Sequence, residues 1–126
     1  MANYYKIEEL KRDGFDIVVD WTDDDTDPEY CFDTSIDPDT GKPYFDVDRI
    51  RRQINSGELV WFVLRVRAFL NGHEFGSSYI GGCLYEYSKI KDVLTDGVAE
   101  ASIELALDEA REQVAGLREK LNSLDF

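Results

Sequence analysis

The residues with the most evident chemical potential are carboxylates that are concentrated in one stretch of the chain. Residues 20–48 include eleven acidic residues and a single base, Lys42. The rest of the chain holds sixteen acidic and thirteen basic residues, so its charges are nearly balanced. Such a run can bind a metal ion, present negative charge to a partner, or keep the chain in solution.

Calcium binding is the first interpretation, because alternating aspartates supply the oxygen ligands that Ca²⁺ prefers. An EF-hand loop has carboxylates at positions 1, 3 and 5, glycine at 6 and glutamate at 12. Asp23, Asp25 and Asp27 fit the first three positions, but position 6 is Pro28 and position 12 is Thr34. A second frame, which starts at Asp37, places its glycine one position too early. These spacings are more typical of turns, so we expect no metal and no cofactor.

Catalytic chemistry has little support in the sequence. His73 is the single histidine, and Cys31 and Cys83 are the only cysteines. If His73 and Cys83 share one strand, their ten-residue separation spans about 33 Å at roughly 3.3 Å per residue. Cys31 lies among aspartates, which disfavour a reactive thiolate. The chain has none of the common phosphate-loop, nucleophile-elbow or zinc-protease motifs, so we predict a protein that is not an enzyme.

The net charge limits the classes of partner. A formal net charge of -13 repels nucleic acid and anionic lipid, whose phosphates have the same sign. We therefore predict no direct binding to nucleic acid or membranes. The first residues lack the apolar segment of a signal peptide, and no apolar run approaches 18 residues. These features favour a cytoplasmic protein.

The leading hypothesis is a small acidic non-catalytic protein that binds a basic protein surface, for which a nucleic-acid-binding protein is one candidate. One concrete form is a nucleic-acid-mimicking inhibitor of a nucleic-acid-handling complex, of the kind that phages and plasmids encode. Eight acidic residues are expected to contact the partner: Asp23, Asp24, Asp25, Asp27, Glu29, Asp33, Asp37 and Asp39.

Three alternatives follow from the same sequence. The acids could neutralise the protein's own bases, within one molecule or across a dimer. A structural or assembly protein could form a homodimer through a sheet face, and an ion- or small-molecule-binding domain is the third class. The bases concerned are Arg49, Arg51, Arg52, Arg65 and Arg67, and the expected sheet-face interface consists of Trp61, Arg65, Arg67 and Ile80.

The elements that must position these residues indicate one α+β domain over residues 1–126. Alternating apolar residues predict a strand over 15–21. A hairpin is predicted over 59–87, because Asn71-Gly72 is the dipeptide that a two-residue type I′ turn prefers. All three prolines fall in residues 22–45, which we predict to be a long acidic loop.

In the simplest register of the hairpin, Leu70 faces His73 and the pairing continues without interruption. One continuous apolar face results and should form the core: Val60, Phe62, Leu64, Val66, Ala68 and Leu70. The second face is mixed, and its expected pairs are Trp61 with Gly82, Val63 with Ile80, Arg65 with Ser78 and Arg67 with Gly76.

Three helices are predicted, over residues 7–14, 46–55 and 98–121. Gly14 could end the first, Asp46 could cap the second, and alanines on the apolar stripe of the third would allow close approach to a sheet. The predicted architecture is a small antiparallel sheet, packed on one face by the long C-terminal helix and the shorter helices.

Overall fold

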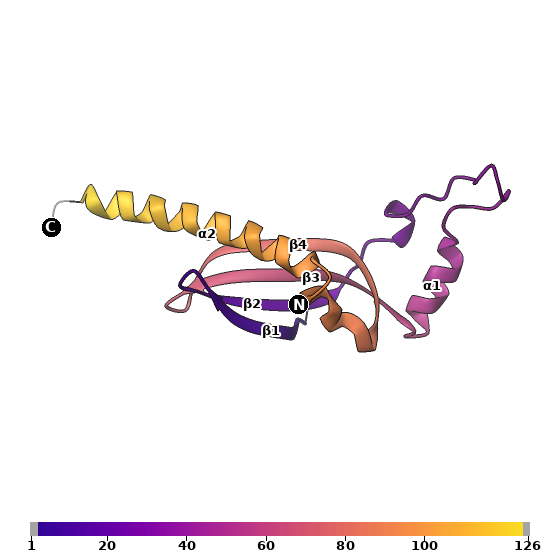
Figure 1. The fold of residues 1–126 in the computed structure, drawn as a ribbon, viewed down its shortest axis with the longest axis horizontal. Coiled ribbons are helices and arrows are strands. Elements are labelled where there is room, and N and C mark those ends of the chain that lie inside the picture. The colour runs from indigo at the N-terminus through magenta and orange to yellow at the C-terminus, as the bar shows by residue number, and fades with distance from the viewer. Residues whose placement is uncertain (1–2, 125–126) are drawn as a thin grey trace.

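The protein has the expected α+β architecture, a four-stranded antiparallel sheet packed against a long C-terminal helix (Figure 1). The computed structural model describes residues 3–124. The strand order is β1-β2-β3-β4, so every strand pairs with its neighbour in the sequence. The elements along the chain are β1 (Tyr5–Arg12), β2 (Phe15–Asp23), the 3₁₀ helix η1 (Pro28–Tyr30), α1 (Val47–Asn55), β3 (Leu59–Leu70), β4 (His73–Glu86), the 3₁₀ helix η2 (Tyr87–Leu94) and α2 (Val98–Asn122).

The core lies between the sheet and α2. The predicted inner face of β3 is confirmed at its centre, where four alternating side chains have no solvent exposure: Phe62, Leu64, Val66 and Ala68. Helix α2 packs most closely on β4, because Gly76 carries no side chain. A methyl group at Gly76 would lie 2.1 Å from the carbonyl oxygen of Ala106. The contact between glycine and alanine thus sets the spacing between helix and sheet.

The helix predicted over residues 7–14 is wrong, because this segment forms the edge strand β1. Asp13 and Gly14 both have positive φ, 54° and 85°, and they form the turn of a hairpin between β1 and β2. Ile7 is buried in the core, and Leu10 packs against it. Pairing with β2 therefore outweighs the helix propensity of a segment rich in Glu, Lys and Leu.

The β3–β4 hairpin turns at Asn71-Gly72 as predicted, but its register shifts twice. Leu70 pairs with His73, whereas Ala68 pairs with Gly76, which leaves one extra residue in β4. A second irregularity lies between the pairs Leu64–Ile80 and Phe62–Cys83. The observed partner of Arg67 is consequently Ser77, that of Arg65 is Tyr79, and that of Trp61 is Leu84.

These β-bulges reverse the faces of the middle of β4, because side chains alternate across a strand. Ile80 packs against the core and does not belong to the second face, contrary to the prediction. Tyr79 is 57% exposed and lies on the opposite side. The glycines at positions 76, 81 and 82 lie at or beside the two irregularities.

The prediction of α1 is confirmed, including the cap, since the Asp46 carboxylate accepts a hydrogen bond from the backbone N–H of Arg49 at 3.1 Å. The β2–β3 connection, which includes α1, forms a separate lobe at the end of the molecule opposite the last turns of α2 (Figure 1). We call residues 24–58 the acidic lobe. The long helix is also confirmed, with observed bounds Val98–Asn122, and its last turns extend beyond the sheet (Figure 1).

Candidate functional site: the acidic lobe

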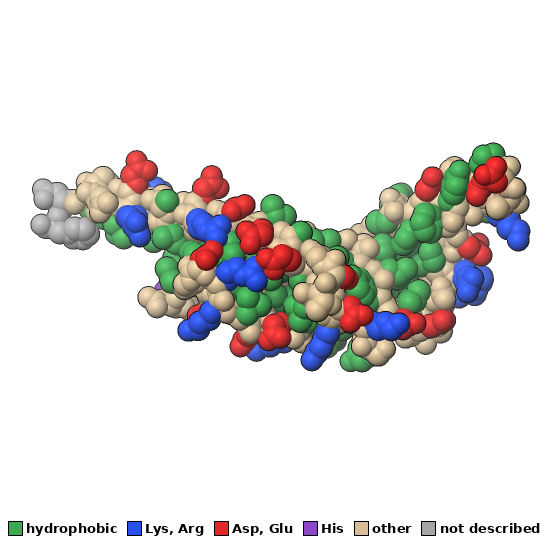
Figure 2. Space-filling model, in the orientation of Figure 1, with side chains coloured by type: hydrophobic (Ala, Val, Ile, Leu, Met, Phe, Trp, Pro, Cys, Tyr) green, Lys and Arg blue, Asp and Glu red, His purple; other side chains and the backbone are tan. Residues whose placement is uncertain are grey.

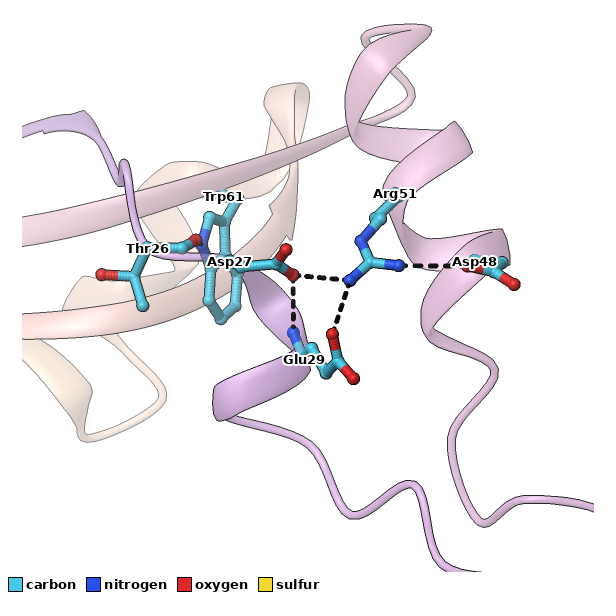
Figure 3. Close-up of polar contacts among 6 residues, drawn as sticks. All are labelled: Thr26, Asp27, Glu29, Asp48, Arg51 and Trp61. Carbon is cyan, nitrogen blue, oxygen red and sulfur yellow. Dashed lines mark hydrogen bonds and ion pairs between the residues drawn. The ribbon is translucent and has the colours of Figure 1, made fainter.

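The acidic lobe is attached to the sheet through Trp61, at the lobe end of β3. The indole Nε1–H of Trp61 donates a hydrogen bond to the carbonyl oxygen of Thr26 at 2.8 Å (Figure 3). In return, the backbone N–H of Asp24 donates to the carbonyl oxygen of Trp61 at 3.0 Å. The ring of Phe32 lies 5.7 Å from that of Trp61. Trp61 is therefore only 4% exposed, and its own chain covers it where an interface with a second copy was expected.

A pair of glycines in β4 forms the surface on which the lobe rests. The Asp24 Oδ2 atom accepts a hydrogen bond from the backbone N–H of Gly82 at 2.9 Å. A methyl group at Gly82 would lie 3.3 Å from Cη2 of Trp61, and one at Gly81 would lie 3.2 Å from Asp24 Oδ2. Gly82 also has φ of +70°, which disfavours any side chain. The lobe thus crosses the outer face of the sheet from β2 as far as β4.

Short-range hydrogen bonds explain why aspartates recur in this segment. Four of them accept a bond from the backbone N–H two residues further along the chain, which is the Asx turn. Carboxylates therefore fix the turns, and the spacing that resembles a calcium loop follows from turn formation. The pairs are Asp24 with Thr26 at 2.8 Å, Asp27 with Glu29 at 3.0 Å, Asp33 with Ser35 at 2.9 Å and Asp37 with Asp39 at 2.9 Å.

Arg51 joins α1 to the turn around η1. Its Nη2 atom donates to Asp27 Oδ1 at 2.9 Å and to Glu29 Oε2 at 3.1 Å, and its Nη1 atom donates to Asp48 Oδ1 at 3.1 Å (Figure 3). Three carboxylates thus share one guanidinium. The interpretation in which the acidic run neutralises the protein's own bases within one molecule holds for Arg51.

The same interpretation holds for Asp20, which lies on the outer face of the sheet. Arg65 donates to both of its carboxylate oxygens, at 2.8 and 2.7 Å, and Arg67 donates to Oδ2 at 3.1 Å. Asp20 is only 4% exposed. The guanidinium of Arg65 also lies 3.4 Å from the ring centroid of Tyr4. The alternation of apolar residues predicts the strand but does not indicate this buried ion pair on its other face.

Three carboxyl groups of the lobe have a pKa below the usual value. For Asp24, burial opposes ionisation, but hydrogen bonds from the backbone of Thr26 and Gly82 outweigh it and lower the pKa. The backbone N–H of Glu29, and then Arg51, lower the pKa of Asp27. The hydroxyl and backbone N–H of Ser35 lower the pKa of Asp33. Each bond favours the charged form of the carboxyl group.

The eight acidic residues predicted to contact a partner fall into two groups. Five of them accept hydrogen bonds that hold the lobe together: Asp24, Asp27, Glu29, Asp33 and Asp37. The carboxylates of Asp23, Asp25 and Asp39 accept none from residues 3–124, and all three residues are exposed. These three are therefore the carboxylates that can be offered to a partner without loss of internal bonds.

Exposed hydrophobic side chains lie among these carboxylates. The sequence analysis did not predict this exposure. Tyr30 is 84% exposed, and Ile36, Tyr44 and Phe45 are also exposed. Figure 2 shows hydrophobic and acidic side chains next to one another over the lobe. A signal for them was present in the sequence, since aromatic residues recur between the prolines and aspartates of residues 28–45.

No group of three or more His, Cys, Asp or Glu side chains in residues 3–124 is arranged to hold a metal ion. Cys83 is buried, and burial raises the pKa of its thiol, whereas Cys31 is exposed in the lobe. His73 lies exposed beside the Asn71-Gly72 turn.

Comparison with known proteins gave no match to a family model, and neither a curated protein nor a solved structure matched the chain. None of the helices within residues 3–124 combines the length and the apolar character that a membrane crossing requires.

Proposed function

We propose that the chain is a small acidic non-catalytic protein that binds a basic surface of another protein through the acidic lobe. The observation that carries the proposal is the combination of exposed hydrophobic side chains with carboxylates that accept no hydrogen bond from residues 3–124. Aromatic side chains are enriched where proteins bind one another, and complementary charge directs the encounter. A lobe that served solubility alone would gain nothing from an exposed Tyr30 or Phe45.

The lobe carries a negative net charge, which supports this proposal, but the charge is smaller than that of the acidic run in the sequence. Residues 24–58 hold ten acidic and four basic residues, a formal net charge of -6. The excess is smaller than in residues 20–48 because α1 brings Arg49, Arg51 and Arg52 into the lobe. Asp23, at the end of β2, adds a further exposed carboxylate beside it.

One concrete form of the proposal is a nucleic-acid-mimicking inhibitor of a nucleic-acid-handling complex, of the phage or plasmid type. A basic groove that accommodates phosphates could accept carboxylates in their place. The Asx turns favour this form because they hold the acidic segment in one conformation before binding, which lowers the entropy lost on association.

The test separates the carboxylates that hold the lobe together from those that are free to bind. We expect the triple variant Asp23→Asn, Asp25→Asn and Asp39→Asn to fold normally and to lose the partner. The immobilised protein is incubated with extract of its native host at low and at high salt, and retained proteins are identified by mass spectrometry. A basic protein should be retained at low salt and released at high salt, because screening weakens exposed ion pairs.

The matched control is the triple variant Glu8→Gln, Asp92→Asn and Glu119→Gln, which removes the same number of charges outside the lobe. It should retain the partner as the wild type does. Equal retention by both triple variants would contradict the proposal. Competition by duplex DNA then tests the mimicry, since an inhibitor of this kind and DNA would exclude one another.

An alternative function, homodimer assembly through the outer face of the sheet, has its own supporting observation. In the described part of the chain, α2 covers only the inner face, and the lobe covers only the Trp61 end of the outer face. Val18, Val63 and Phe69 are half-buried there, and Tyr79 is exposed. Light scattering tests this alternative, and a monomer at tens of micromolar counts against a stable dimer.

A further inference from the structure

The two edges of the sheet differ in how they are protected from pairing with another chain. The β1 edge carries charged side chains along its length: Lys6, Glu8, Glu9, Lys11 and Arg12. Charges of this kind discourage strand addition. β4 has no charged residue between Glu74 and Glu86, although it is the longest strand in the described sheet, with 14 residues. The β4 edge therefore lacks charged protection between these two residues, and the regular stretch between its two β-bulges is residues 76–80.

The backbone of the β4 edge is also accessible for pairing. Within residues 3–124, the N–H of Gly82 is the one backbone group of β4 that donates a hydrogen bond to a residue outside the hairpin, and it donates to Asp24. The other outward-facing N–H and C=O groups of β4 have no hydrogen-bonding partner in this part of the chain. They form the row of donors and acceptors that an added strand requires.

A groove runs beside the first half of this edge, between β4 and α2. Phe75 and Gly76 line it on the strand side, and Glu109 and Gln113 line it on the helix side. Further along α2, the lining continues with Glu112, Gly116 and Leu117 and ends at one base, Lys120. Side chains of an added strand that point toward α2 would enter this groove, where the exposed carboxylates of Glu109 and Glu112 favour Lys or Arg.

Acidic residues also lie near the other end of the edge. Asp24 contacts Gly82 there, and the exposed carboxylates of Asp23 and Asp25 flank it in the sequence. The edge is therefore uncharged in its middle and acidic at both ends. This arrangement matches an extended segment whose centre is uncharged and whose ends are basic.

We propose that the β4 edge is a strand-addition site for an extended segment of the basic partner, with an uncharged β-forming centre and Lys or Arg at both ends. This inference rests on the proposed function, and it adds the form in which the partner binds. A second copy of the chain fits less well. Antiparallel pairing of two β4 strands about their centre would bring Glu74 of one copy next to Glu86 of the other, and like charges oppose such pairing.

The experiment uses a synthetic peptide as the probe, Lys-Arg-Thr-Val-Thr-Tyr-Thr-Val-Thr-Arg-Lys with blocked termini. Amide hydrogen exchange of the full chain is followed by NMR with and without the peptide. We expect exchange to slow by about tenfold or more at alternate residues of β4, whose N–H groups point away from β3, and to stay unchanged in β1.

A second peptide of the same charge, with proline in place of two central threonines, is the backbone control. Proline has no N–H group and is excluded from paired strands, so this peptide should not protect β4. Equal binding of the two peptides would overturn the proposal, because the attraction would then be electrostatic only. Absence of protection in β4 at saturating concentrations of the first peptide would overturn it as well.

Variants of the chain test the charged end of the groove. Glu109→Gln with Glu112→Gln should weaken binding of the first peptide by about three- to tenfold, since two exposed ion pairs are lost. Glu8→Gln with Glu119→Gln, which makes the same change of charge elsewhere, should leave binding unchanged. Equal weakening by both pairs of substitutions would contradict the assignment of the groove.

The outcomes distinguish this inference from the function on which it rests. If the Asp23, Asp25 and Asp39 variant loses the host partner but β4 is never protected, the proposed function stands and the strand-addition site is wrong. Sedimentation of the protein without peptide measures whether it forms a dimer. A dimer whose β4 amides are already protected would overturn the proposal, because a second copy would then occupy the edge.

Discussion

The sheet with its covering helix and the acidic lobe are held together in different ways. In the first region, side chains from β2, β3 and α2 with no solvent exposure, such as Ile17, Leu64 and Leu107, meet across large distances in the sequence. In the lobe, many of the hydrogen bonds join residues only two positions apart, and large side chains such as Tyr30 remain exposed. The first region depends on burial of apolar surface and the second on local turns with a few attachments.

This difference matters for function, because a surface that is to bind a partner has to keep its side chains accessible. The lobe can expose carboxylates and aromatic side chains since its conformation does not depend on burying them. The lobe is attached to the sheet by the hydrogen bonds of Trp61 and Asp24. Within the lobe, Arg51 joins α1 to the turn around η1. Substitutions that act on one region and spare the other can test this division.

The largest effect is expected where α2 meets β4. Gly76→Ala would place a methyl group 2.1 Å from the carbonyl oxygen of Ala106, so helix and sheet must move apart. We expect the free energy of unfolding to fall by at least about 1–3 kcal/mol, as for other overpacked cores. Urea denaturation measures the change.

Gly116→Ala is the matched control for that substitution, because a methyl group there meets no atom within 4 Å. Its expected effect has the opposite sign, a gain of about 0.5–1 kcal/mol, since alanine replaces glycine inside a helix. A loss of stability of the same size in both variants would contradict the tight contact at Gly76.

A smaller effect is expected where the lobe is attached. Trp61→Phe keeps an aromatic ring but removes the hydrogen bond to Thr26, which is 2.8 Å long. We expect a loss of about 0.5–1.5 kcal/mol, confined to the lobe. Amide exchange should accelerate in residues 24–58 and remain slow in β3 and α2, whereas uniform acceleration would show that the two regions unfold as one.

The smallest effect is expected from acid. The pKa values of Asp24, Asp27 and Asp33 are lower in the folded lobe than in the unfolded chain. Their contribution to stability is thus complete above the unfolded value of about 3.9 and is lost as the pH falls through the lower folded values. In a Trp21→Phe background, Trp61 emission should shift to longer wavelength as the pH falls below about 3.9. An unchanged spectrum would contradict this role of the turns.

The sequence predicted the elements whose signals are local. β2, the Asn71-Gly72 turn, α1 with its Asp46 cap and α2 follow from alternation, turn chemistry and helical periodicity. β1 was mistaken for a helix because its residues favour one, although Asp13-Gly14 is also a dipeptide that hairpin turns prefer. Tertiary pairing, which a single segment does not encode, decided between the two.

The candidate site was predictable in composition but less so in geometry. The acidic residues were located, yet the division between structural carboxylates such as Asp33 and free ones such as Asp25 depends on which backbone N–H each side chain meets. The orientation of Ile80 depends on bulges that regular alternation does not reveal. Coverage of Trp61 by the lobe joins segments 35 residues apart, at Thr26 and Trp61, for which no local pattern gives a signal.

The lobe is inserted between two strands that pair with each other, and this placement has a consequence for variation in length. The 35 residues between Asp23 and Leu59 form one closed loop whose ends are held by the β2–β3 ladder. The entropy of closing a flexible loop grows only with the logarithm of its length, about 0.6 kcal/mol for each doubling. Insertions or deletions in the exposed segment around residues 33–45 should therefore change the stability of the sheet very little. The chain can alter the shape of its proposed binding surface there while the strands and α2 keep their arrangement.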